Sequence, residues 1–491
     1  MSNPIKKLAG QTAVYGLSSI VGRLLNYLLV PLYVAVLADP SDYGVVSELY
    51  AWIAFLMVLL TFGMETAYFK FLTEATDRQK VFQNSLLSVL SVNGLFLVLL
   101  LIFHPYIADK LLYPENPEYI ILLGLIVVLD ACSALPLAKL RAEEKARKFA
   151  LIQLSGIGVN IVLNLILLLL VFDQTSDDPE VAIRYIFVSN LVASAVKPAL
   201  LYRDFAKLRW HWDFGLVKAM IRYSFPLALA GFAFIINETV DRILLKHLTY
   251  HYASEEFSSS VALDKAEYAV GVYSASYKLS MLVTIFLQAY RYAAEPFFFA
   301  ESKSKDRNKT YVKVMNYFVG AVFVCFLGVT LNMDVFKYFI PNENYWEGLQ
   351  IVPILLLANV FSGIYINQSI WYKLSGQTKF GAYIAMAGAF FTLTLNFIFI
   401  PIYGYIACAW VTFAVYGGQM VASYILGQKY YPIPYNLRKF TLYALVAILF
   451  YFLANLMNID EGLLQMIIHN LLIVIYIALI YWMEKPTRRL T

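Results

Sequence analysis

The sequence predicts an all-α polytopic membrane protein with about fourteen transmembrane helices, arranged as two six-helix lobes related by a parallel repeat plus a C-terminal helix pair. Composition is the first reason: 60% of the 491 residues are hydrophobic and 14% are charged, whereas about a quarter of the residues in soluble domains are charged. The second reason is that apolar runs of about 20 residues recur along the chain, each long enough to cross a hydrocarbon layer of about 30 Å. The third reason is an internal repeat.

Apolar runs between charged or Pro- and Gly-marked loops predict the individual helices. The first run follows Lys6 and Lys7, as in a secretory signal, but it is too long for the apolar core of a signal peptide, so we expect an uncleaved first helix. The predicted helices are residues 11–38, 44–72, 82–104, 118–138, 149–172, 181–201, 222–246, 267–299, 311–334, 347–372, 380–402, 404–427, 439–457 and 463–483.

The distribution of Lys and Arg predicts the orientation. Most of the 38 basic residues lie in alternate loops, such as 139–148, 203–222 and 303–313, while the loops between them, such as 38–41 and 173–180, hold few. Because basic residues favour the cytoplasmic side of short loops, the pattern predicts an even number of helices with both termini in the cytoplasm. The basic residues form no continuous face, so the net charge of +5 does not indicate nucleic-acid binding.

Two short echoes predict the repeat. Residues 139–140 (Lys-Leu) recur at 373–374, and residues 42–45 (DYGV) recur in similar form at 267–270 (EYAV), at nearly the same offset. Because six helices separate the copies, an even number, the two lobes are expected to have the same membrane orientation. The predicted divisions are residues 1–210 for the first lobe, 211–430 for the second lobe and 431–491 for the terminal pair.

The sequence contains no phosphate-binding loop, zinc-protease motif or serine-hydrolase elbow. All three cysteines, Cys132, Cys325 and Cys408, fall inside predicted spans, which leaves neither a disulfide framework nor a zinc-finger spacing. We therefore expect a protein that is not an enzyme and has no cofactor, and whose energy comes from an H⁺ or Na⁺ gradient, a partner or product removal.

Charged residues inside the predicted spans gather on the first two helices of each lobe. An ionisable group in a span costs roughly 2.5 to 3.5 kcal/mol on insertion scales, so it usually faces a partner or a watery cavity. These positions predict a polar cavity between the lobes, lined by the first, second, seventh and eighth helices. The residues concerned are Arg23, Glu48, Glu65, Glu238, Asp241, Arg242, Lys278, Arg291 and Glu295.

Cations beside aromatic rings suit an anionic amphiphile that carries sugars, because arginine and lysine bind phosphate oxygens. The candidate substrate-binding residues are Arg23, Arg242, Lys278, Arg291, Tyr273 and Tyr277. The candidate charge partners, or groups coupled to an ion gradient, are Glu48, Glu65, Glu238 and Asp241. In the alternative interpretation, Glu238 with Arg242 and Arg291 with Glu295, each four residues apart, simply neutralise each other.

Five short segments occur in a characteristic order: YSFPL at 223–227, DRIL at 241–244, VGVYS at 270–274, YKL at 277–279 and PIYG at 401–404. With these segments the sequence resembles the polysaccharide-flippase branch of the multidrug/oligosaccharidyl-lipid/polysaccharide exporter superfamily. The resemblance implies that undecaprenyl-pyrophosphate-linked oligosaccharide, as for O-antigen, capsule or exopolysaccharide, is flipped from the cytoplasmic to the outer leaflet of a bacterial inner membrane by alternating access. The implied partners are the lipid-linked oligosaccharide, membrane lipid and other polysaccharide-assembly proteins.

Three alternatives stay open. A flippase for the peptidoglycan precursor lipid would carry membrane-embedded arginines in its first helix, a pattern that Arg23 follows in part. A cation-coupled multidrug exporter of the same superfamily would be expected to carry an acid in that helix, where this sequence has none. A polysaccharide polymerase or ligase would need a large outer loop, and the longest one predicted, 249–267, is short.

Overall fold

The computed structural model describes residues 20–485, except 176–177, 209, 303 and 458–461. Within these residues, thirteen helices are long and apolar enough to cross a membrane, and a shorter apolar helix covers Ile20–Val36. The thirteen helices correspond one to one with the second to fourteenth predicted spans, and Ile20–Val36 is the described part of the first. The predicted all-helical membrane fold is confirmed.

Contacts between residues divide the chain into two compact units, Met1–Gly271 and Val272–Thr491. The first unit extends past the predicted lobe boundary near residue 210 because α10 packs against α3, α4 and α5. The lobe boundary itself stays a prediction. The helices of the first unit are α2 (Val30–Val36), α3 (Pro40–Thr61), α4 (Met64–Glu74), α5 (Arg78–Lys110), α6 (Glu118–Ala142), α7 (Ala146–Ile166) with its π-helical end (Leu167–Val171), α8 (Pro179–Leu200), α9 (Tyr202–Ala206) and α10 (Phe214–Ala253), followed by the first turns of α11 (Ser259–Glu301).

Aspartate caps begin four of these helices, α3, α5, α8 and α10. Asp39 accepts a hydrogen bond from the amide of Ser41 at 2.9 Å, and Pro40 occupies the first helical position, where its missing N–H is no loss. Asp178 begins α8 in the same way, and Asp213 caps α10 by accepting from the amide of Leu216 at 3.0 Å. These caps set the points at which α3, α8 and α10 start.

The second span is one apolar run that the backbone interrupts. Phe62 (φ 35°) and Gly63 (φ 69°) both adopt the left-handed conformation, so α3 ends at Thr61 and α4 starts at Met64. A left-handed pair of this kind satisfies the last carbonyls of a helix and changes the direction of the chain. Glu48 on α3 and Glu65 on α4 therefore lie on two separate helices.

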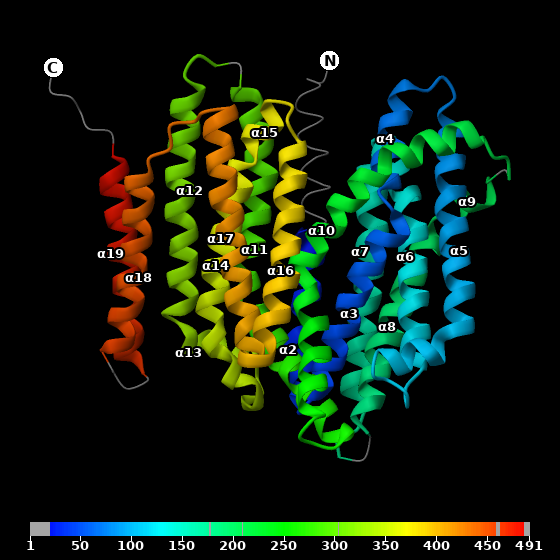
Figure 1. Cartoon of the computed structure of the whole chain (residues 1–491), viewed down its shortest axis with the longest axis horizontal. Coiled ribbons are helices and arrows are strands. Elements are labelled where there is room, and N and C mark those ends of the chain that lie inside the picture. The colour runs from blue at the N-terminus through cyan, green and yellow to red at the C-terminus, as the bar shows by residue number, and fades with distance from the viewer. Residues whose placement is uncertain (1–19, 176–177, 209, 303, 458–461, 486–491) are drawn as a thin grey trace. The chain divides into compact units, whose positions relative to one another are not determined.

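The second unit is formed by the rest of α11 and the helices after it, which Figure 1 shows from green to red. Its C-terminal helices, α18 and α19, contact each other and α12. Only 17% and 11% of their apolar windows are buried, so most of these apolar residues are not covered by the rest of the chain. The helices are α12 (Arg307–Thr330), α13 (Met333–Phe336), two 3₁₀ segments (Lys337–Phe339 and Glu343–Ile351), α14 (Val352–Gln368), α15 (Ile370–Leu374), α16 (Lys379–Tyr403), α17 (Tyr405–Tyr430), α18 (Leu437–Leu456) and α19 (Leu463–Glu484).

Candidate functional site

Two glycines bring the backbones of α3 and the first turns of α11 into direct contact. A β-carbon on Gly44 would lie 2.0 Å from the carbonyl oxygen of Glu267, and one on Gly271 would lie 1.8 Å from that of Pro40. Both distances are shorter than any real contact of a β-carbon, so each position requires glycine as the backbones stand. The contact lies at the two echoing segments, 42–45 and 267–270.

Beside this contact, three charged side chains from three helices form what we call the ion cluster: Glu48 of α3, Lys246 of α10 and Glu267 of α11. The Nζ atom of Lys246 lies 3.0 Å from Oε2 of Glu48 and 3.0 Å from Oε1 of Glu267. The side chains of Lys246 and Glu48 are 1% and 0% exposed, and that of Glu267 is 14% exposed. A lysine this deeply buried is tolerated only with charge partners.

Further hydrogen bonds complete the ion cluster. Tyr113, in the loop between α5 and α6, donates to Oε2 of Glu48 at 2.5 Å, and the indole of Trp52 donates to Oε1 at 3.0 Å. Burial and the nearby charge of Glu48 raise the pKa of Tyr113, which keeps its phenol protonated as a donor. Lys246 also donates to the carbonyl oxygen of Leu111 at 3.3 Å, and its Nζ lies 3.5 Å from the centre of the Tyr113 ring.

One turn before Lys246 on α10, Arg242 is buried beside two of the predicted acids. Its Nη1 atom donates to Oδ1 of Asp241 and to the backbone carbonyl oxygen of Glu238, each at 2.9 Å. The structure thus brings together three residues that were predicted on the seventh helix. Their polar atoms, like those of the ion cluster, lie among the residues of membrane-spanning helices.

The other predicted residues of the first unit lie in different surroundings. Arg23 is exposed. Glu65 forms an ion pair of 2.5 Å with Arg141 at the end of α6. Glu48 and Glu65 therefore each pair with a cation of another helix. These cations are Lys246 and Arg141, and not the predicted Arg23 or Lys278.

In the second unit, Tyr273 and Tyr277 are buried one turn apart on α11, with ring centres 6.0 Å apart. Lys278 is half-buried and Arg291 is exposed. The side chain of Glu295, the predicted partner of Arg291, lies outside the described residues. Binding of substrate by these residues, and the shared cavity between lobes, stay predictions.

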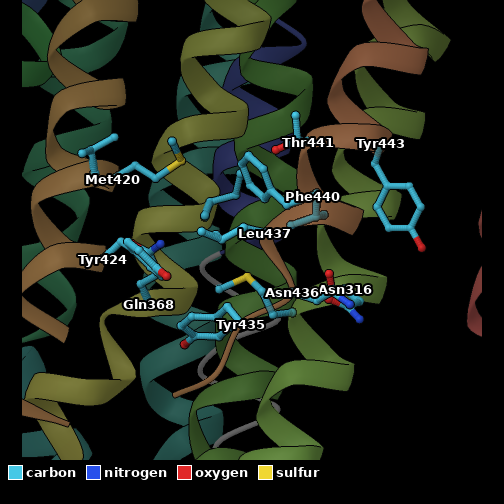
Figure 2. Close-up of a pocket in the computed structure, with 14 residues that line it drawn as sticks. Asn316, Gln368, Met420, Tyr424, Tyr435, Asn436, Leu437, Phe440, Thr441 and Tyr443 are labelled. Carbon is cyan, nitrogen blue, oxygen red and sulfur yellow. The ribbon is translucent and has the colours of Figure 1, made fainter. Parts of the chain in front are cut away.

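The second unit also contains a mostly apolar pocket of about 260 Å³ between α12, α14, α17 and α18. Figure 2 shows the apolar side chains of Met420, Leu437 and Phe440 in its lining, with the amide of Gln368 and the phenol of Tyr424 among them. A pocket of this composition suits a hydrocarbon chain rather than a free sugar.

Sequence reasoning missed Lys246 and Glu267 as site residues. The apolar run predicted that the seventh helix ends at residue 246, whereas α10 continues to Ala253, which puts Lys246 inside the helix. The sequence did contain one signal for Lys246. It lies four residues after Arg242, a spacing that puts both cations on one helical face. Among the described residues, no group of three or more His, Cys, Asp or Glu side chains is arranged to hold a metal ion.

Comparisons with known proteins concern the family of the chain and its fold. A family model for polysaccharide biosynthesis proteins matches residues 8–302. The fold is similar to that of the lipid II flippase MurJ in an inward closed conformation, with a TM-score of 0.67, 16% identity and coverage of 95% of this chain and 98% of that chain. It is also similar to that of an inward-facing multidrug resistance MATE family transporter of the MOP superfamily, with a TM-score of 0.62, 14% identity and coverage of 85% and 94%. A search of curated proteins gave no match.

Proposed function

The chain belongs to the polysaccharide biosynthesis protein family, and from this premise we propose that it moves an oligosaccharide linked to undecaprenyl pyrophosphate from the cytoplasmic to the outer leaflet. Family and fold agree with the exporter superfamily that the sequence motifs indicated. The two solved structures with a similar fold are a lipid II flippase and a multidrug resistance transporter. The lipid-linked oligosaccharide, the inner membrane of a bacterium and the assembly partners are the specific parts of the proposal.

The observation that carries the proposal is the ion cluster of Glu48, Lys246 and Glu267. Charged groups at membrane depth cost several kcal/mol unless they are paired, so helices that only pack against lipid do not carry them. The ion cluster joins α3 and α10 to the first turns of α11, inside the part of the chain that the family model matches. In alternating access the ion cluster is formed in one state and separated in the other.

Charge and apolar volume support the proposed substrate class. Arg23, Arg242, Lys278 and Arg291 supply cations for a pyrophosphate, which binds guanidinium and ammonium groups through charge-assisted hydrogen bonds. The apolar pocket of about 260 Å³ in the second unit supplies room for part of a hydrocarbon chain. Tyr273 and Tyr277 are the proposed sugar contacts, and H⁺ or Na⁺ is the proposed source of energy.

The test is a strain whose own copy of the gene is deleted and replaced by variants, with surface polysaccharide measured by immunoblot. Arg23→Gln and Lys278→Gln should each lower surface polysaccharide by roughly tenfold or more, since each removes a charge-assisted contact of about 1.5–3 kcal/mol. Lys110→Gln, at a side chain that is 63% exposed, is the matched control and should leave the level unchanged. Equal amounts of protein in the membrane fraction would exclude a folding defect.

Unchanged surface polysaccharide in both variants would overturn the assigned role of these cations, and an unchanged level in the deletion strain would overturn the proposed function. Accumulation of the peptidoglycan precursor in the deletion strain would instead favour the second candidate, a flippase of that lipid. This candidate has the support of the fold that the chain shares with MurJ over 95% of its length. Increased drug sensitivity alone would favour a multidrug exporter.

A further inference from the structure

Helix α10 is longer than one membrane crossing requires, and its first turns form a separate arm. At 1.5 Å per residue its 40 residues extend over about 60 Å, about twice the thickness of the hydrocarbon layer. Pro226 lies inside the helix, where a proline bends the axis. In Figure 1 the first turns of α10 run beside α4, and the rest of the helix continues in another direction. We call residues 214–225 the arm.

One face of the arm packs against the first unit. Val217, Met220 and Ser224 follow each other at spacings of three and four residues, and all three are buried. Met220 belongs to a hydrophobic cluster that also contains Met64 of α4 and Phe82 of α5. Packing therefore holds this face of the arm against α4 and α5.

The opposite face of the arm is exposed and carries both apolar and basic side chains. Phe214, Ile221 and Phe225 are 78%, 42% and 59% exposed, and spacings of seven and four residues put them on one side of the helix. Lys218 and Arg222 are exposed next to this apolar strip. An apolar strip with basic residues beside it is typical of a helix that lies at a membrane surface. We call these five residues the arm face.

The two cations of the arm face are without a counter-charge in the part of the chain that the structure describes. Asp204 and Asp213, the two acids of residues 202–225, form ion pairs of 2.6 Å and 2.7 Å with lysines of α6 and α5. Among the described residues, the side chains of Lys218 and Arg222 form no ion pair or hydrogen bond. The arm face therefore presents an uncompensated positive charge to its surroundings.

The residues before the arm indicate the side of the membrane and the partner. Arg203, Lys207 and Arg209 precede it in the sequence, and Trp210 is 78% exposed. By the preference of basic residues for the cytoplasmic side, this is the predicted cytoplasmic end of α10, and tryptophan favours the level of the lipid headgroups. Anionic phospholipids give the cytoplasmic leaflet a negative surface that attracts lysine and arginine. Charge complementarity therefore selects anionic phospholipid as the partner of the arm face.

We infer that the arm face lies in the headgroup layer of the cytoplasmic leaflet, where Lys218 and Arg222 bind the headgroups of anionic phospholipids. The apolar strip enters the border between headgroups and acyl chains. This partner is bilayer lipid and not the cargo, so the inference goes beyond the proposed function. Because α10 also supplies Lys246, the lipid holds the beginning of a helix whose later turns belong to the ion cluster.

The experiment places a fluorophore on the arm of the purified full chain in lipid vesicles. Bimane is attached at Ala219→Cys, an exposed arm position, after alanine has replaced the native cysteines Cys132, Cys325 and Cys408. Quenching by phosphatidylglycerol with a nitroxide near its headgroup is compared with quenching by the matching phosphatidylcholine. The ratio gives the preference of the arm for the anionic lipid, and it should be about tenfold or more. Lys218→Gln combined with Arg222→Gln should bring it close to one.

Two further variants serve as controls. Lys305→Gln combined with Lys313→Gln removes two exposed cations of the second unit on the same predicted side, and should leave the ratio within about twofold of its original value. The charge-conserving pair Lys218→Arg and Arg222→Lys should keep the ratio within about threefold.

Equal quenching by the two lipids in the chain with both arm cations would overturn the selection of anionic lipid. No quenching by either lipid would overturn the membrane contact and indicate that water or another protein covers the arm face. A loss of preference in the control at Lys305 and Lys313 equal to that in the arm variant would overturn the assignment to Lys218 and Arg222. All three outcomes would leave the proposed function standing, because the polysaccharide assay tests the cargo separately.

Discussion

Replacing Lys246 by methionine should strongly destabilise the protein, because it leaves two buried carboxylates without their shared cation. Both carboxylate oxygens lie 3.0 Å from the lysine Nζ, so they are at most about 6 Å apart. At an effective dielectric constant of about 20, two unit charges at that distance repel by roughly 3 kcal/mol. Removal of one partner from a buried ion pair costs about 3–5 kcal/mol, which is the loss we expect in the free energy of unfolding.

The measurement is unfolding of the purified protein by sodium dodecyl sulfate in mixed micelles. The triple variant Glu48→Gln, Lys246→Met, Glu267→Gln is the informative comparison, because it removes the charges together and should recover much of the lost stability. Lys309→Met, which removes an ion pair whose lysine side chain is 86% exposed, is the control and should change little. If Lys246→Met and the triple variant were equally stable, electrostatic repulsion would not be the cause of the loss.

Two further predictions concern the ends of α3 and α10. Gly44→Ala should destabilise the protein, because the new β-carbon would lie 2.0 Å from the carbonyl oxygen of Glu267. Gly94→Ala is the control, because its β-carbon would lie in open space. Equal denaturation midpoints for the two variants would contradict the prediction. The second prediction concerns Asp213, whose pKa is lowered by a hydrogen bond from Lys80. The stabilisation from the ionised carboxylate of Asp213 is present above the unfolded pKa of about 4 and is lost as the pH falls through the lower folded pKa. Asp213→Asn should therefore flatten the decline in stability measured between about pH 5 and pH 2, and an unchanged decline would refute the assignment.

The apolar spans could be predicted because each extends over about 20 residues, so that length and hydropathy alone identify it. Their ends could not, and the seventh span shows why. Its last turns, up to Ala253, contain Lys246 and His247, which look like loop residues until tertiary structure supplies Glu48 and Glu267 as partners. For a polar residue that distant segments bury, the local sequence gives little signal, which for Lys246 is only its spacing of four residues from Arg242.

The candidate site, too, could be predicted only where its residues are close together in the sequence. The acids and Arg242 of the seventh helix are close in sequence, so their proximity follows from helical geometry. The partner of Glu65 is Arg141, which lies on another helix and was counted as a loop cation. The echo between 42–45 and 267–270 marked two segments that touch, although nothing in the sequence indicated that their backbones meet at glycines.

The low burial of α18 and α19 makes this pair sensitive to membrane thickness. Helices of 20 and 22 residues are about 30 Å and 33 Å long, which matches an average hydrocarbon layer with little reserve. A thicker bilayer would leave their ends short, a mismatch that local thinning of the bilayer around these helices or snorkelling of their flanking residues accommodates. Lipid composition therefore acts on the second unit through its outermost helices.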